Sequence, residues 1–198
     1  MAASRKPTAK DEPNRRAEIV RAASRLFAEK GYAATPIRDI ARAVDMQSGS
    51  PFYHFKTKHD MLKAVALEGI ASISRAVSKA AERGDTPRAT FEAMLLAHLE
   101  QLLGDDGRHF AATLLHESHH LDPAALAELI EQKDAYEALW QKALRELKRS
   151  GEIADDSRVT RLLLMGALNW TVQWYRPNGG RTVKQIARQI SGMLLKSR

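Results

Sequence analysis

Apolar residues recur at helical spacing along almost the whole of this chain, and this pattern constrains its fold more than any other feature. Ile19, Ala23, Leu26 and Phe27, for example, are spaced at i, i+4, i+7 and i+8, which places them on one face of a helix. The alternation of apolar and polar residues that marks a strand is nearly absent. The sequence therefore predicts an all-α fold with about nine helices.

Helix start and stop signals divide the chain. A hydroxyl or carboxylate side chain followed by proline can cap a new helix, as at Thr35-Pro36, Thr86-Pro87 and Asp122-Pro123. Thr182 and Gln185 have the spacing of a capping box. The expected helices cover residues 14–30, 36–44, 48–54, 58–83, 87–103, 108–119 (after a loop at 104–107), 123–150, 155 or 156 to 175, and 182 to near the C-terminus.

The positive charge of the chain is concentrated in its first third. Residues 1–58 contain 12 lysines and arginines against six acidic residues, whereas residues 59–198 contain 19 against 18. Nearly all of the formal net charge of +7 therefore lies in the first segment. This asymmetry favours a polyanion such as nucleic acid as the partner of that segment, with a basic solubilising tail as the alternative.

Two short helices joined by a tight turn, after a longer supporting helix, are the arrangement of a helix-turn-helix. The second short helix enters the major groove with its N-terminal residues on the base edges. Gln and Ser side chains donate and accept hydrogen bonds, as base reading requires, and glycine allows close backbone approach. Base contacts are expected from Gln47, Ser48, Gly49 and Ser50, and phosphate contacts from Thr35, Arg38, Tyr53, His54 and Lys58.

Pro51 limits where the second short helix can begin, because proline is tolerated only within the first helical turn. With Ser48 as the N-cap, Pro51 is the third helical residue and no hydrogen bond is lost. The helix is therefore expected to start at Ser48. Phe52 and Phe55 are expected to pack in the core.

The segments LFAEKGY, TPIRDIARAV and SGSPFYHFKTK, which lie between Ile19 and Lys58, resemble the TetR family of bacterial transcription regulators. About the first 60 residues carry the close resemblance, and the helix count extends it over the whole chain. The resemblance implies that the DNA-contact candidates named above, apart from Gly49, face DNA. It also implies a ligand pocket in the middle helices and a homodimer with a four-helix interface. The chain departs from the family at Pro51, where leucine is usual.

The eighth expected helix contains RLLLMGALNWTVQWY and is apolar on nearly every side. Such a helix is buried on more than one face, and Gly166 and Ala167 permit the close approach of another helix. The ninth expected helix carries one apolar stripe. Together they predict a two-fold homodimer interface through helices eight and nine, with an internal pair in a monomer as the alternative.

The eighth expected helix also carries two indoles and two amides, which could line a ligand site or lie in the core. The stretch GALNWTVQWYRPNGG is similar to the C-terminal region of TetR-family regulators that respond to acyl-coenzyme A thioesters. This similarity implies an apolar tunnel for an acyl chain, with basic residues near its mouth. The ligand candidates are Asn169, Trp170, Gln173 and Trp174, with Arg161 and Arg176 for the phosphates.

The segment HESHH, from His116 to His120, literally matches the zinc-protease pattern His-Glu-x-x-His. The helix that carries it is about to end at Asp122-Pro123, and no third ligand is evident. Histidines near a helix C-terminus are also favoured by the helix dipole. We therefore expect no catalytic metal and assign no metal ligands.

The absence of cysteine excludes disulfides, thiolate catalysis and cysteine-based zinc sites. The longest apolar run, Leu162 to Trp170, is too short to span a bilayer, and the N-terminal residues lack the apolar segment of a secretory signal. The expected location is the cytoplasm, without a cofactor and without a membrane partner.

The expected organisation is a disordered basic arm at residues 1–13, a helix-turn-helix domain at 14–56, and a ligand-binding and dimerisation domain at 57–198. The expected function is sequence-specific regulation of transcription, by a repressor that a hydrophobic small molecule, such as an acyl-coenzyme A, releases from its operator. A helical protein-binding adaptor and a zinc hydrolase built on HESHH are the alternatives. Salt-dependent binding to duplex DNA separates the first function from the other two.

Overall fold

The computed structural model describes residues 12–196, and within them it contains helices and no strand. The expected all-α fold is therefore confirmed, with eight α-helices and two short 3-10 helices among the described residues. The helix expected at 48–54 forms one of the 3-10 helices. The elements are α1 (Glu12–Lys30), α2 (Ile37–Ala43), η1 (Ser50–Tyr53), α3 (Lys58–Ala81), α4 (Pro87–Leu103), α5 (Asp105–Glu117), η2 (Ser118–His120), α6 (Pro123–Arg149), α7 (Arg158–Trp174) and α8 (Val183–Leu194).

The arm expected at residues 1–13 lies almost entirely outside the described residues. The exception is its last two positions, which belong to α1 because that helix begins at Glu12.

Side-chain caps fix most of the helix starts. Thr57, Thr86, Asp122 and Thr182 each accept a hydrogen bond from a backbone N–H in the first turn, and α3 and α8 have complete capping boxes. The starts expected at these caps are confirmed. Because a cap needs only residues within one turn, these boundaries can be read from local sequence.

The start expected for the eighth helix at Asp155 or Asp156 is wrong, because Ser157 caps α7. The Asp155 carboxylate instead accepts hydrogen bonds from the hydroxyls of Ser157 and Thr160. These bonds lower the pKa of Asp155.

The loop expected at residues 104–107 is reduced to Gly104, since α5 already begins at Asp105. Gly107 lies buried against the end of α4, where a Cβ atom would come within 1.9 Å of the Gln101 carbonyl oxygen. Only glycine permits this close approach. It lets α5 turn away directly after α4.

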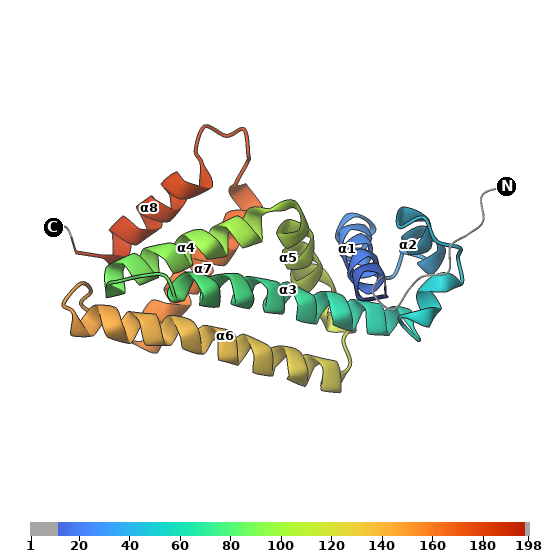
Figure 1. Cartoon of the computed structure of the whole chain (residues 1–198), viewed down its shortest axis with the longest axis horizontal. Helices are drawn as coiled ribbons and strands as arrows, with labels where there is room; N and C mark the ends of the chain where they lie inside the picture. Colours follow the sequence, from blue (N-terminus) through green and yellow to red (C-terminus); the bar gives the residue numbers. More distant parts are fainter. Residues whose placement is uncertain (1–11, 197–198) are drawn as a thin grey trace.

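The molecule is elongated, with α1 and α2 at one end and α3 running from that end alongside α6 (Figure 1). Two clusters of buried apolar side chains hold it together. Met61 and Val65 of α3 lie in the first cluster, with residues of α1 and α2, whereas Ile73 and Val77 of the same helix lie in the second, with residues of α4, α6, α7 and α8. Helix α3 therefore belongs to both cores.

Among the described residues, the helices are all too short or too polar to cross a membrane.

Candidate DNA-binding surface and ligand cavity

The segment expected to read DNA forms a tight 3-10 turn rather than an α-helix. The backbone N–H of Ser50 donates to the Gln47 carbonyl at 2.9 Å, and that of Phe52 donates to the Gly49 carbonyl at 3.3 Å. Pro51 has no N–H to donate, so these bonds on either side of it hold the turn. The helix start expected at Ser48 is therefore wrong, since η1 begins at Ser50.

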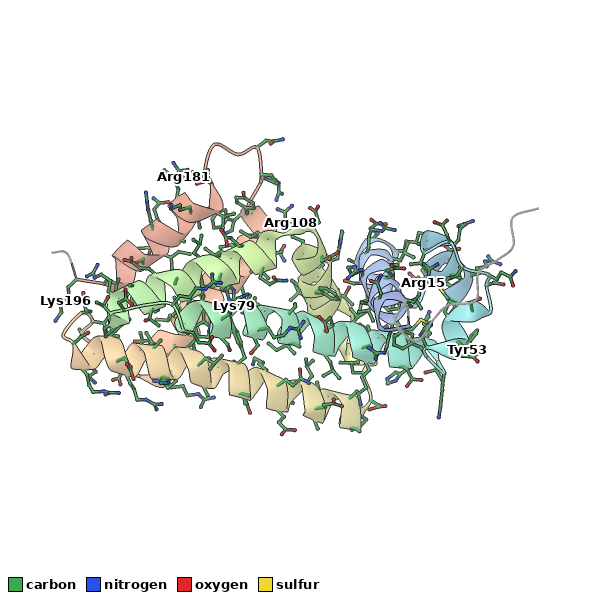
Figure 2. All side chains as sticks on the ribbon, viewed as in Figure 1. Arg15, Tyr53, Lys79, Arg108, Arg181 and Lys196 are labelled. Carbon is green, nitrogen blue, oxygen red and sulfur yellow. The ribbon has the colours of Figure 1, made fainter. Side chains whose placement is uncertain are left out.

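The turn presents its polar residues to solvent. Tyr53 is 90% exposed and lies at the α1–α2 end of the molecule (Figure 2). Pro51 and Phe55 are buried beneath it, as expected for Phe55, but the expectation that Phe52 lies in the core is wrong because its side chain is exposed. Arg38, Gln47, Ser48 and Gly49 are exposed, and Ser50 and His54 are partly exposed.

The structure places Thr35 inside the protein. Its side chain is fully buried, and its hydroxyl lies 2.7 Å from the Gly31 carbonyl oxygen and 3.2 Å from that of Leu26. The hydroxyl therefore ties the connection after α1 to α1 itself. In this conformation it does not face a phosphate.

Lys58 is also occupied within the protein. Its ammonium donates to the carbonyls of Tyr32 (2.6 Å), Thr35 (3.0 Å) and Ala33 (3.3 Å), and it lies 4.4 Å from the centre of the Tyr32 ring. Burial lowers the pKa of Lys58, but three acceptors compensate the cation. The first residue of α3 thus anchors the α1–α2 connection, and it does not present a free ammonium to DNA.

A cavity of about 560 Å³ lies between α3, α4, α5, α6 and α7. This size lies within the usual range of small-molecule sites. Asn169, Trp170 and Gln173 line the cavity, whereas Trp174, Arg161 and Arg176 are not among the lining residues. Most of the wall is apolar and comes from Ile70, Ile73, Leu102, Phe110, Leu114 and Met165.

A buried polar group interrupts the apolar wall. His98 is fully buried, and its Nδ1 lies 2.6 Å from the hydroxyl oxygen of Tyr136. Burial lowers the pKa of His98 to about 3, although the nearby Asn169 side chain opposes this shift. His98 is therefore neutral at physiological pH, and its Nε2 has no partner in hydrogen-bond geometry among the described residues.

The tautomer of His98 depends on its pairing with Tyr136, because a phenolic hydroxyl can either donate or accept a hydrogen bond. Burial raises the pKa of Tyr136, so its hydroxyl keeps its proton. With Tyr136 as the donor to His98 Nδ1, the proton of His98 lies on Nε2.

Charged groups at the cavity wall are already paired. Glu137 forms ion pairs with Lys133 at 3.2 Å and with Arg161 at 3.1 Å. Two cations on one carboxylate leave one positive charge in excess. Arg176 is exposed and donates to the carbonyls of Gln173 and Tyr175 at the end of α7, away from this cluster.

Helix α7 has two apolar faces. Leu164, Met165 and Leu168 are buried in the core of this chain. The opposite face is apolar yet exposed, with Leu163 at 70% and Trp170 at 64%. Further exposed apolar side chains on α7 and α8 are Val159, Leu162, Trp174 and Met193. A face of this kind typically marks an interaction surface.

Sequence reasoning missed His98 and Tyr136 as cavity residues, although a signal was present. Each is a polar-tipped ring within an apolar helical stripe, His98 after Phe91 and Leu95, and Tyr136 before Trp140. The stripe indicates burial, but it does not distinguish a cavity wall from a filled core.

An all-helical chain with an exposed helix-turn-helix at one end and a largely apolar cavity among its other helices has the architecture of a ligand-responsive DNA-binding regulator. Residues 19–65 match the family described as "Bacterial regulatory proteins, tetR family", and residues 84–197 match "Tetracyclin repressor-like, C-terminal domain". The chain belongs to the TetR family.

Related proteins agree with this assignment. The HTH-type transcriptional repressor KstR2 of Rhodococcus jostii (strain RHA1) is 29% identical, over 91% of this chain and 89% of that protein. The structure of the superantigen PfiT has a TM-score of 0.78 and 36% identity, over 92% of this chain and 97% of the other. AibR, in complex with isovaleryl coenzyme A and operator DNA, has a TM-score of 0.79 and 25% identity, over 91% and 97%.

This chain is therefore a TetR-family transcriptional repressor with a DNA-binding helix-turn-helix. KstR2 of Rhodococcus jostii and KstR2 of Mycolicibacterium smegmatis are both named as transcriptional repressors.

Proposed function

We propose that the protein acts as a homodimeric repressor that leaves its operator when an acyl-coenzyme A enters the cavity. One observation carries this proposal, namely that α3 reaches both sites. Its first residue, Lys58, anchors the α1–α2 connection, and Gly69, Ile70 and Ile73 of the same helix line the cavity. A ligand that moves the middle of α3 would therefore also move the DNA-binding helices.

The exposed turn supports two kinds of DNA contact, one to base edges and one to phosphates. Gln47, Ser48, Gly49 and Ser50 would meet base edges, and Arg38, Tyr53 and His54 would meet phosphates. Thr35 and Lys58 would shape this surface from within, because both side chains are held by backbone carbonyls.

The proposed organisation places the helix-turn-helix at residues 14–56 and the ligand-binding and dimerisation part at 57–198. The Thr57 cap, which begins α3, supports this boundary. The exposed apolar face of α7, extended by Met193 of α8, supports a two-fold interface formed by these two helices. Such a dimer would present its recognition turns about 34–36 Å apart, in successive major grooves.

The cavity chemistry supports a ligand with an apolar chain and a carbonyl group. The apolar wall suits the chain. The Nε2–H of His98, which is covered in this structure, would donate to the carbonyl oxygen once a side-chain movement opened it to the cavity. The positive charge in excess around Glu137 would favour an anionic portion near the wall. The cavity suits an acyl group rather than a whole coenzyme A thioester, so the nucleotide portion would remain outside.

The proposal is tested by titrating acyl-coenzyme A thioesters of increasing chain length into the complex with DNA from upstream of the protein's own gene. Fluorescence anisotropy should fall at micromolar ligand, and free coenzyme A should have no effect. Release by free coenzyme A, or no release by any chain length, would contradict the ligand class without affecting DNA binding itself.

Two variants of His98 test whether its side chain donates a hydrogen bond to the ligand carbonyl. His98→Leu removes the donor and should weaken the response to acyl-coenzyme A by about tenfold, which corresponds to about 1.4 kcal/mol for one hydrogen bond. His98→Gln keeps an N–H donor and should retain most of the response. Equal loss in both variants would argue against recognition of a carbonyl at this position.

A further inference from the structure

The segment HESHH adopts a geometry that the i, i+4 pattern does not anticipate. Helix α5 ends at Glu117, and Ser118–His120 form the 3-10 helix η2. The zinc-hydrolase alternative needs His116 and His120 on one helical face, and it is wrong because the α-helix ends between them. Instead, the ligand atoms of Glu117, His119 and His120 all lie within 4.8 Å of one another, and His116 is not part of this group.

We propose that Glu117, His119 and His120 form a binding site for a divalent transition-metal ion such as Zn²⁺, Ni²⁺ or Cu²⁺. Two imidazoles and one carboxylate are ligands that these ions accept. His120 Nε2 lies 3.6 Å from Glu117 Oε2. Ligands bound tetrahedrally at about 2.0–2.1 Å are separated by roughly 3.3–3.4 Å, so the His120–Glu117 pair is already near this separation. Rotation of the exposed His119 side chain would bring the third ligand into place.

The surroundings of Glu117 also favour a cation. Its side chain is only 14% exposed, and its ion-pair partner within residues 12–196 is His120. A covered carboxylate is costly unless it is paired with a charge. His119 is exposed, so an ion could enter from solvent, and water would fill the remaining coordination positions.

The site lies where the end of α5 meets the α1–α2 connection, between the DNA-binding end and the rest of the molecule. The His120 ring is 4.9 Å from the Tyr32 ring, and the Glu117 carboxylate lies beside Gly31 at the end of α1. The carbonyl of Tyr32 in turn accepts a hydrogen bond from Lys58. A bound ion would fix the His120 ring and Glu117, and would thereby stiffen the α1–α2 connection against α5.

The first experiment is calorimetric titration of ZnCl₂ into the full-length protein, with CoCl₂ as a spectroscopic probe. One ion per chain should bind with micromolar or tighter affinity. His119→Ala and Glu117→Gln should each weaken binding by at least the about 10–100-fold that loss of an outer-shell partner costs, because each alters a direct ligand. His116→Ala is the matched control and should bind like the parent protein.

Absence of binding by the parent protein would overturn the site, as would undiminished binding by His119→Ala or comparable loss in His116→Ala. The stiffening is tested by hydrogen–deuterium exchange of residues 31–36 with and without Zn²⁺. Exchange should slow in the parent protein and stay unchanged in His119→Ala. Binding without any slowing would overturn the coupling to the α1–α2 connection.

Discussion

The buried imidazole of His98 shows how one residue can connect stability with recognition. Its Nδ1 is held by Tyr136, its ring lies among aromatic neighbours, and its Nε2 faces no partner in hydrogen-bond geometry among the described residues. A polar atom buried in this way is costly, although the nearby Asn169 side chain offsets part of the cost. We therefore regard His98 as the polar end of the proposed ligand site.

The depressed pKa of His98 predicts acid-sensitive folding. The pKa of His98 is 6.5 in the unfolded chain and about 3 in the folded protein. Between pH 6.5 and about pH 3 the unfolded chain therefore binds a proton that the folded protein does not bind, so the free energy of unfolding falls as the pH decreases through this range. From pH 7 to pH 5 this group should cost about 2 kcal/mol. Urea unfolding should show that His98→Gln loses correspondingly less stability over this interval. An equal loss in parent and variant would refute the burial of a neutral imidazole.

Base reading and phosphate contact predict different outcomes at the DNA surface. Gln47→Ala should reduce the preference for operator over random DNA, by about 1–3 kcal/mol for a bidentate base contact. Competition binding at fixed salt measures this difference. A parallel loss on both kinds of DNA would exclude Gln47 as a base reader.

Tyr53→Phe removes a hydroxyl at the exposed tip of the turn without removing the ring. It should weaken binding to operator and random DNA alike, by about 1 kcal/mol for a single hydrogen bond. Because Tyr53 is 90% exposed, the melting temperature should not change. A changed sequence preference would instead place Tyr53 at a base.

Among the helices, α3 is fixed at its start to the α1–α2 connection through Lys58. Lys58→Met should loosen the α1–α2 connection, because three carbonyls lose a charged donor. The free energy of unfolding should fall by about 2 kcal/mol, and DNA binding should weaken with it. If Lys58→Met weakened DNA binding with unchanged stability, Lys58 would act at a phosphate after all.

Helix α7 permits a direct test of the proposed dimer. Leu163→Arg places a charge on the exposed apolar face and should yield a folded monomer, measured by analytical ultracentrifugation and circular dichroism. Ile130→Arg is the matched control, because Ile130 is a similarly exposed apolar residue on α6. Dimers in both variants, or monomers in both, would argue against the α7 face.

The sequence predicts those features that depend on neighbouring residues. The starts of α3, α4, α6 and α8 follow from their caps, and the burial of Phe55 follows from its place in the motif. The direct turn from α4 into α5 depends on how Gly107 packs against Gln101, which no local pattern specifies.

The residues of the candidate sites also fall into those that local sequence predicts and those that depend on tertiary packing. An exposed polar turn at 47–53 can be anticipated from composition and spacing. The positions of Thr35 and Lys58 cannot, because their carbonyl partners lie elsewhere in the fold. The cavity is assembled from five helices, so its membership is a property of tertiary packing.

For the whole molecule, the sites follow one another along its length. The basic helix-turn-helix occupies one end, the cavity lies beside the middle of α3, and α8 lies towards the other end (Figure 1). In a dimer formed through α7 and α8, the separation of the two recognition turns would depend on the direction of α3 in each subunit. A small change at the cavity would therefore be amplified at the DNA.

The distance between the two DNA-binding ends in the dimer should change when the ligand binds. The chain has no cysteine, so Glu29→Cys, an exposed position on α1, accepts a single spin label per subunit. Electron–electron double resonance should give one narrow distance distribution on operator DNA. Acyl-coenzyme A should replace it with a different distribution as DNA is released. No dipolar signal between subunits, or an unchanged distribution after ligand-induced release, would contradict the proposed mechanism.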